Sequence, residues 1–303
     1  MRALARFILS GPIPAIAVVS GFAVLSLPFP FLIIVSGAAL ALVTLQLGLL
    51  HGVKVMLTCT VLILVSSYFL MGSISIGPLY AWLSVIVLAA VYRNTQSINL
   101  SLQLLTVLGL CSLLLIVAAF PDIQNFWQSF LQSAFKVIEQ DPAFEGIRQS
   151  AKLSPERLEK YLPIIASIMT GVLISLYILT TAITFFLGRQ WQGFQENIRS
   201  FREEFITLRM GKVLAILAIG FLLAALLLKY AILWQLALVC LSIFSIQGMA
   251  IVHAILGQFS NSIIGFVMVY GLLFIAAPQM IMTLSTLGGV DAFFNFRKRF
   301  IKT

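Results

Sequence analysis

The sequence predicts an all-α protein, a polytopic bundle of membrane-spanning helices. Of its 303 residues, 61% are hydrophobic and only 10% are charged, whereas a soluble domain is usually about 45–50% apolar and about 25% charged. Such a chain lacks the polar residues that would cover a surface in water. Its apolar runs are continuous, as in LAILAIGFLLAALLL (214–228). In hydrocarbon a run of this kind satisfies its backbone hydrogen bonds by forming a helix, and the alternating pattern of a membrane β-strand is missing.

Nine apolar segments follow one another along the chain. They lie at about 12–27, 31–50, 54–71, 75–92, 98–119, 161–188, 211–229, 231–256 and 262–286. A membrane helix needs about 20 residues. The first two segments are short and are separated by Pro28-Phe29-Pro30, so they form either a tight hairpin or a re-entrant pair. The basic N-terminus imitates a signal peptide, but no convincing small-x-small cleavage site follows it, and we expect it to remain as a first helix.

Two stretches are amphipathic instead of apolar. Within 120–160, the run DIQNFWQSFLQSAFKVIEQ places its apolar side chains at helical spacing. Asp141-Pro142 ends this helix, and Ser154-Pro155-Glu156 begins the next one, which continues into the sixth apolar segment. Within 189–212, the apolar residues recur at steps of four and three, with cations between them. This pattern predicts an interfacial helix that holds two spans together or docks a partner.

Lysines and arginines mark the cytoplasmic ends of membrane helices. If the spans alternate, the four cations before residue 100 and the 189–212 segment fall on one side. We therefore expect a cytoplasmic N-terminus and an extracytoplasmic 120–160 loop within a single membrane domain, 1–303. Nine crossings would put the basic tail, 288–303, outside, against the rule. Eight crossings with one re-entrant segment are favoured, and nine is the alternative.

Sequence motifs for catalysis are missing. No phosphate-binding Gly-x-x-x-x-Gly-Lys-Ser/Thr loop, His-Glu-x-x-His zinc pair or Gly-x-Ser-x-Gly elbow occurs, and no carboxylate lies in the middle of an apolar segment. We expect neither an enzyme nor a bound cofactor or metal. The net charge of +9 is spread over short segments beside apolar runs, which is typical of membrane topology signals and argues against nucleic-acid binding. The three cysteines lie inside apolar runs, where we expect small buried hydrophobes.

Polar side chains gather in one apolar stretch, SIQGMAIVHAILGQFSN (245–261). Residues eleven apart nearly eclipse one another on a helix, so Gln247 and Gln258 share one stripe. A second stripe comprises Ser242, Ser245, Met249 and His253. A polar group that faces lipid tails without a partner costs on the order of a few kcal/mol, so both stripes should face other helices or a wet cavity. Hydrogen bonding between helices, contact with a ligand and proton relay through His253 all remain open.

The tail LGGVDAFFNFRKRF predicts a helix end at Gly288-Gly289 and a cap at Asp291. The phenylalanines and cations that follow suit an interfacial helix near anionic lipid.

Three segments resemble the YybS-like family of predicted bacterial membrane proteins: FREEFITLR (201–209), QGMAIVH (247–253) and LGGVDAFFNFR (287–297). The resemblance extends from the Pro28 region to the tail. It implies the bacterial cytoplasmic (inner) membrane, and a distant likeness to the substrate-binding subunits of energy-coupling-factor transporters and to the MreD group. Those subunits dock an energising module through Ala-x-x-x-Ala; here Ala17 and Gly21 have that spacing. The resemblance transfers no catalytic residues.

Two functions are therefore expected from different classes. The first is a substrate-binding or translocating membrane subunit of a transporter, energised by a partner. The second is a membrane scaffold or assembly factor for envelope or division proteins. In the first case the ligand-binding residues would be Gln247, His253, Gln258 and Ser245. In either case the lipid bilayer or another membrane protein would contact six cations, namely Arg199, Arg202, Arg209, Arg297, Lys298 and Arg299.

Overall fold

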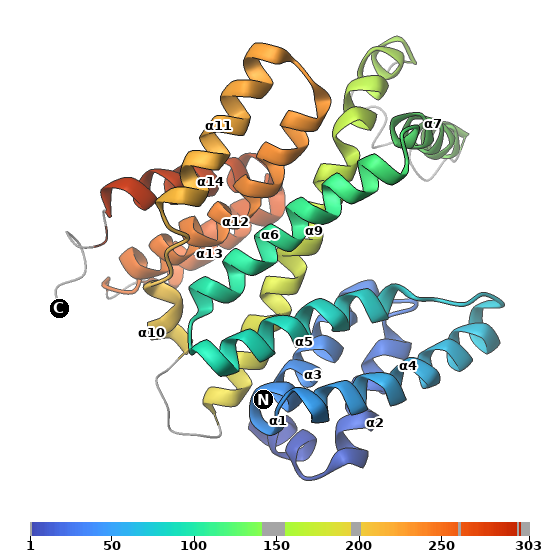
Figure 1. Cartoon of the computed structure of the whole chain (residues 1–303), viewed down its shortest axis with the longest axis vertical. Helices are drawn as coiled ribbons and strands as arrows, with labels where there is room; N and C mark the ends of the chain where they lie inside the picture. The colour runs from blue at the N-terminus through green and yellow to red at the C-terminus, as the bar shows by residue number, and fades with distance from the viewer. Residues whose placement is uncertain (1, 141–154, 195–200, 260–261, 296, 298–303) are drawn as a thin grey trace. The chain divides into compact units, whose positions relative to one another are not determined.

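The computed structural model describes residues 2–140, 155–194, 201–259, 262–295 and 297, without the side chains of residues 139 and 155–159. Within these ranges every regular element is helical, which confirms the all-α prediction (Figure 1). The elements are α1 (Arg2–Leu9), α2 (Pro12–Leu25), the 3₁₀ turn η1 (Pro30–Leu32), α3 (Ile33–Leu47), α4 (Leu49–Met71), α5 (Gly77–Thr95), α6 (Ile98–Ala119), α7 (Ile123–Gln140), α9 (Pro155–Gly193), α10 (Phe201–Ile206), α11 (Lys212–Leu228), α12 (Ala231–Leu256), α13 (Ser262–Ile275) and α14 (Ala277–Phe294).

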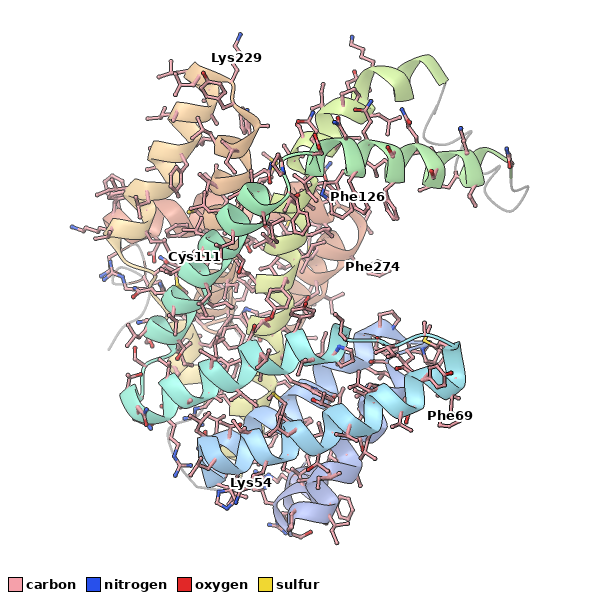
Figure 2. The ribbon with its side chains drawn as sticks, turned by 45° about the vertical axis from the view of Figure 1, so that its right-hand side comes forward. Lys54, Phe69, Cys111, Phe126, Lys229 and Phe274 are labelled. Carbon is pink, nitrogen blue, oxygen red and sulfur yellow. The ribbon has the colours of Figure 1, made fainter. Side chains whose placement is uncertain are left out.

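Five helical segments of the described ranges are long and apolar enough to cross a membrane. They are Pro30–Leu47, Leu49–Met71, Ile98–Ala119, Lys160–Gly193 and Ala231–Leu256. Three apolar helices are shorter: α2, α11 and α13. At about 1.5 Å per residue, the 14 residues of α2 and of α13 extend less than the hydrocarbon thickness of roughly 30 Å. Large apolar side chains point outward, including Phe69 on α4 and Phe274 on α13 (Figure 2).

The last apolar segment, expected as one span at 262–286, is two helices. α13 ends at Ile275, Ala276 has non-helical backbone angles (φ −130°, ψ 50°), and α14 begins at Ala277 with Pro278 in its first turn. Proline has no backbone N–H to continue the hydrogen bonding of α13, but it is tolerated in the first turn of a new helix. The break therefore has a local cause in the sequence.

By its internal contacts the chain divides into two compact units. The first comprises Met1–Thr106, Tyr177–Gly211 and Ile243–Thr303, and the second comprises Val107–Leu176 and Lys212–Ser242. In the first unit α3 packs against α2, α4 and α5 (Figure 1). Every residue from Ser36 to Leu45 is buried, as expected for a helix that is apolar all round. The indole of Trp82 donates to Ser36 Oγ (3.0 Å), which itself donates to the Val19 carbonyl (2.7 Å).

The part of α12 from Ile243 onward lies in the first unit with α14, and there the backbones of the two helices are in contact. A Cβ added at Gly248 would collide with the Leu284 carbonyl, and one added at Gly288 would collide with the Phe244 carbonyl. The absence of a side chain at Gly248 thus lets the α14 backbone approach α12. The expected helix end at Gly288-Gly289 is wrong, because α14 continues to Phe294 with Asp291 inside it. Gly248 and Gly288 both allow close helix packing. From the sequence alone, the pair Gly288-Gly289 could equally have marked the end of a helix.

In the second unit, α7 forms where apolar side chains of the 120–160 segment recur at helical spacing. Trp127 on this helix donates its indole N–H to Thr170 Oγ1 on α9 (2.9 Å). Further along α9, Gly171 leaves room for Gln235 of α12, whose amide donates to the Ser167 carbonyl (2.8 Å). The Asp141-Pro142 and Ser154 signals lie outside the described residues.

The segment 189–212 is not the single helix that its periodicity predicted. α9 continues to Gly193, α10 occupies Phe201–Ile206, and residues 207–211 are not helical. In this last stretch the backbone N–H groups bind side chains of other helices: Arg209 N donates to Asn99 Oδ1 (2.9 Å), and Met210 N donates to Gln247 Oε1 (2.8 Å). Tertiary hydrogen bonds thus replace the helical ones. Gly211 follows with a positive φ of 86°, a conformation that suits glycine.

Candidate ligand cavity

A cavity of about 520 Å³ lies inside the first unit, walled by α9, α10, α12, α13 and α14. Small-molecule sites usually have about 300–1,000 Å³ and a mostly apolar lining with a few polar groups. This cavity has that character. Its apolar lining is Leu179, Ile183, Phe186, Phe201, Phe205, Ile206, Ile246, Met249, Leu273, Ala277, Ile281 and Leu284. Its polar lining is Gln190, Arg202, Ser245, His253 and Tyr270.

His253 is fixed in the cavity wall by hydrogen bonds from both ring nitrogens. Nδ1 lies 2.9 Å from the Met249 carbonyl oxygen, and Nε2 lies 3.1 Å from the Tyr270 hydroxyl. A carbonyl oxygen only accepts, so Nδ1 carries the proton in this contact, and Nε2 can accept from the tyrosine O–H. The protein therefore satisfies both nitrogens of the imidazole.

Aromatic rings surround this imidazole. The His253 ring centroid lies 5.4 Å from that of Phe205, 4.8 Å from that of Phe266 and 5.9 Å from that of Tyr270. Phe186 on α9 extends the cluster to Phe205, at 5.5 Å. Edge and tilted contacts at these distances are favourable. They join α9, α10, α12 and α13 around one end of the cavity.

A buried ion pair, here called the Arg189 clamp, holds α10 against α9 and α5. Arg189 Nη2 lies 2.6 Å from Glu204 Oε1, and the two side chains are 2% and 15% exposed. Arg189 Nε donates to the Tyr92 hydroxyl (2.7 Å), which lies 3.0 Å from Glu204 Oε2. The guanidinium carbon also lies 5.1 Å from the centroid of the Tyr92 ring. Hydrogen bonds to both partners offset part of the desolvation of these charges.

A second buried pair, here called the Asp291 clamp, holds the segment after α10. Asp291 Oδ2 accepts from Arg297 Nη2 (2.8 Å) and from Gln247 Nε2 (3.0 Å). Arg297 also donates to the carbonyls of Ile206 and Leu208. Within the described residues Asp291 Oδ1 has no hydrogen-bond partner. The two clamps together anchor α10, one wall of the cavity, from both sides.

The structure separates the four residues predicted to bind a ligand. Ser245 and His253 line the cavity. Gln247 does not; it is completely buried in the Asp291 clamp. Gln258 lies in the turn after α12, where its amide donates to the carbonyl of Ala254 (3.3 Å). The two stripes predicted on this helix therefore have different surroundings.

The predicted cationic surface is also divided. Arg202 lines the cavity, and Arg209 binds Asn99 through its backbone. Arg297, expected to face lipid or a partner, is buried against Asp291. Arg199, Lys298 and Arg299 lie outside the described residues.

Several residues of the site had no place in the sequence-based predictions. Arg189, Glu204 and Tyr92 form a clamp, and Phe186 and Tyr270 line the cavity. No local signal singles out Glu204, because charged residues flank it in FREEFITLR (201–209), and the cation that its burial requires is distant in the fold. Among the described residues no group of three or more histidine, cysteine, aspartate or glutamate side chains could hold a metal ion.

Comparison with family models, with curated proteins and with solved structures finds no significant match. The cavity and its walls are therefore the structural basis for a functional proposal.

Proposed function

We propose that this chain is a multi-span protein of the bacterial cytoplasmic membrane that binds a small molecule in the cavity beside α10. It serves as the substrate-binding or translocating subunit of a transporter that a partner energises. The observation that carries this proposal is the cavity itself, with its apolar lining and few polar groups. We assign it no catalytic residues.

The link to a partner rests on α10. This short helix forms one wall of the cavity, and the Arg189 and Asp291 clamps couple it to α5, α9, α12 and α14. A partner that pushes on the 189–212 segment would change the cavity wall directly. That arrangement fits a binding subunit whose energy comes from outside the chain.

The proposal includes eight crossings with a cytoplasmic N-terminus. The shortness of α13 and its break at Ala276 support a re-entrant segment there, which returns the basic tail to the cytoplasmic side. The resemblance to the YybS-like family is part of the same proposal. A cysteine appended after Thr303 in a cysteine-free variant tests the topology. Impermeant maleimide should label it in inverted membrane vesicles and leave it unlabelled in whole cells; the reverse pattern excludes eight crossings.

A ligand screen by thermal shift tests binding in this cavity. The purified protein is screened with small molecules extracted from a bacterial membrane and cytoplasm, and compared with two variants. Ile281→Trp fills the cavity, since Ile281 is part of its lining. Met282→Trp is the matched control, because Met282 is the next residue on α14, is 71% exposed and does not line the cavity.

A ligand that binds in the cavity should raise the melting temperature of the native protein and of Met282→Trp. It should leave Ile281→Trp unchanged, because the indole occupies its place. If compounds stabilise all three proteins equally, they bind elsewhere and the cavity is not the site. If none of the extracted small molecules raises the melting temperature of the native protein, the proposal of a binding subunit fails.

A further inference from the structure

We propose that the cavity takes a single-chain amphiphile with a carboxylate headgroup, whose acid group meets Arg202 and Gln190. This inference rests on the proposed function and specifies its ligand class. It follows from the hydrogen bonds of the polar lining, from the position of Arg202 and from the distribution of apolar residues along the cavity.

The polar lining leaves two side chains available. His253 and Tyr270 bind each other, and the second nitrogen of His253 binds Met249. Arg202 and Gln190 line the same cavity, and within the described residues neither has a hydrogen bond to another group of the protein or a carboxylate partner. A guanidinium and an amide can both donate to one carboxylate.

The guanidinium of Arg202 lies beside the end of α12. Its Nη2 approaches Gly257, just beyond the C-terminus of α12, so closely that an added Cβ would lie 2.6 Å from it. The C-terminal end of a helix carries partial negative charge and attracts a cation. The neighbouring carboxylate of Glu204 is already paired with Arg189. Arg202 therefore brings an unneutralised positive charge to the cavity.

The two polar donors lie at one end of the cavity. Gln190 belongs to the last turn of α9 before its end at Gly193, and the Arg189 clamp fixes this turn to α10, which carries Arg202. Leu179 also lines the cavity, and it lies about 16 Å from Gln190 along the axis of α9. The side chains between them, Ile183 and Phe186, are apolar. An occupant that follows α9 would thus meet charge at one end and aliphatic groups at the other.

The charge balance favours a carboxylate over a phosphate. Among the described lining residues Arg202 is the one permanent cation, and it balances a single negative charge. Phosphate groups are commonly met by clusters of arginines. The aromatic rings of Phe201 and Phe205 also line this end, where the Arg202 side chain is exposed.

Photo-crosslinking with matched probes tests the assignment. The full-length protein in lipid nanodiscs is illuminated with hexadecanoic acid carrying a diazirine near the end of its chain, or with the methyl ester of the same probe. Adducts are then located by mass spectrometry. The variants are Arg202→Gln and, as a control cation in the same segment, Arg209→Gln, which lies outside the lining.

The acid should label the aliphatic end of the cavity, around Leu179, Ile246 and Leu284. Unlabelled hexadecanoate should compete. Apparent affinity for the acid should fall roughly ten- to a hundred-fold in Arg202→Gln, as for loss of a charge-assisted hydrogen bond, and stay unchanged in Arg209→Gln. Arg202→Lys should retain part of the binding because it keeps the charge.

Two other outcomes would contradict the headgroup assignment or the amphiphile inference as a whole. If the ester labels the cavity as well as the acid does, and Arg202→Gln changes neither, the cavity binds amphiphiles without regard to charge. The headgroup assignment then fails while the proposed binding function stands. If labelling occurs only on outward-facing residues such as Phe274, or if neither probe is competed, the amphiphile inference is wrong. The ligand screen with Ile281→Trp then decides the binding function separately.

Discussion

Gln247 donates its side-chain amide to Asp291 across the α12–α14 crossing, with 3.0 Å between Nε2 and Oδ2. Its amide oxygen at the same time accepts the backbone N–H of Met210 (2.8 Å). One side chain thus joins three segments that are far apart in sequence. The sequence predicts this amide to be a ligand contact, but its oxygen and its nitrogen both bind other parts of the protein.

Replacement of Gln247 by leucine should destabilise the protein far more than the same change at Gln258. The first leaves the buried N–H of Met210 and the Asp291 carboxylate with fewer partners, at about 1–3 kcal/mol for each unsatisfied group. Gln258 is exposed in the turn after α12 and donates to the Ala254 carbonyl, so its replacement should cost less than about 0.5 kcal/mol. Melting temperatures of both variants in one detergent make the comparison. Equal shifts would exclude the structural role of Gln247.

The Arg189 clamp predicts that neutralising the Glu204 carboxylate strongly destabilises the protein. Glu204→Gln leaves the buried Arg189 guanidinium without its counter-charge, which should cost about 3–5 kcal/mol. The adjacent Glu203→Gln provides the control, because Glu203 is exposed and exposed ion pairs contribute about 0–1 kcal/mol. Denaturant unfolding of the two variants in mixed micelles measures the difference. A similar loss in both would mean that the clamp does not hold α10.

Neighbouring glycines on α14 should respond in opposite directions to alanine. Gly288→Ala places a Cβ against the Phe244 carbonyl, and overpacking of this kind costs about 1–3 kcal/mol. Gly289 has open space around its Cβ position, so alanine there should stabilise the helix by about 0.5–1 kcal/mol. Thermal unfolding of both variants gives the sign of each change. Stabilisation by Gly288→Ala would rule out the backbone contact of α12 with α14.

The three cysteines should differ in reactivity. All were expected to be buried, but Cys111 is exposed on α6, whereas Cys59 and Cys240 are buried. In detergent, N-ethylmaleimide should modify Cys111 first and the other two only after unfolding. In lipid bilayers a hydrophilic maleimide should leave Cys111 unmodified as well, because the thiolate that reacts does not form in hydrocarbon. Rapid modification in bilayers would place that part of α6 in water.

The sequence was informative wherever one physical cause acted alone. Continuous apolar runs had to be helices, and α7 forms where its apolar residues recur at helical spacing. The proline at 278 ends α13, although the hydropathy pattern alone did not show that break. Within the polar stretch on α12, two of four candidate residues, Ser245 and His253, line the cavity.

The other features depend on partners that are distant in sequence. Periodicity extended the 189–212 helix through Leu208, but Asn99 and Gln247 bind the backbone there. Arg297 follows an apolar helix and so resembles a cation that marks the cytoplasmic side of the membrane. It is instead buried in an ion pair with Asp291, six residues earlier. Neither the Arg189 clamp nor the crossing at Gly248 and Gly288 has a local sequence pattern that separates it from an ordinary helix contact.

The contact of α12 with α14 restricts how the cavity can open. Two backbones that touch at Gly248 and Gly288 cannot slide past each other without steric collision, and α10 is anchored by two ion pairs. α13 is different: none of its residues is buried, and its junction with α14 at Ala276 is already non-helical. We therefore expect an occupant to enter sideways from the bilayer, past a swinging α13, and not through a water-filled mouth.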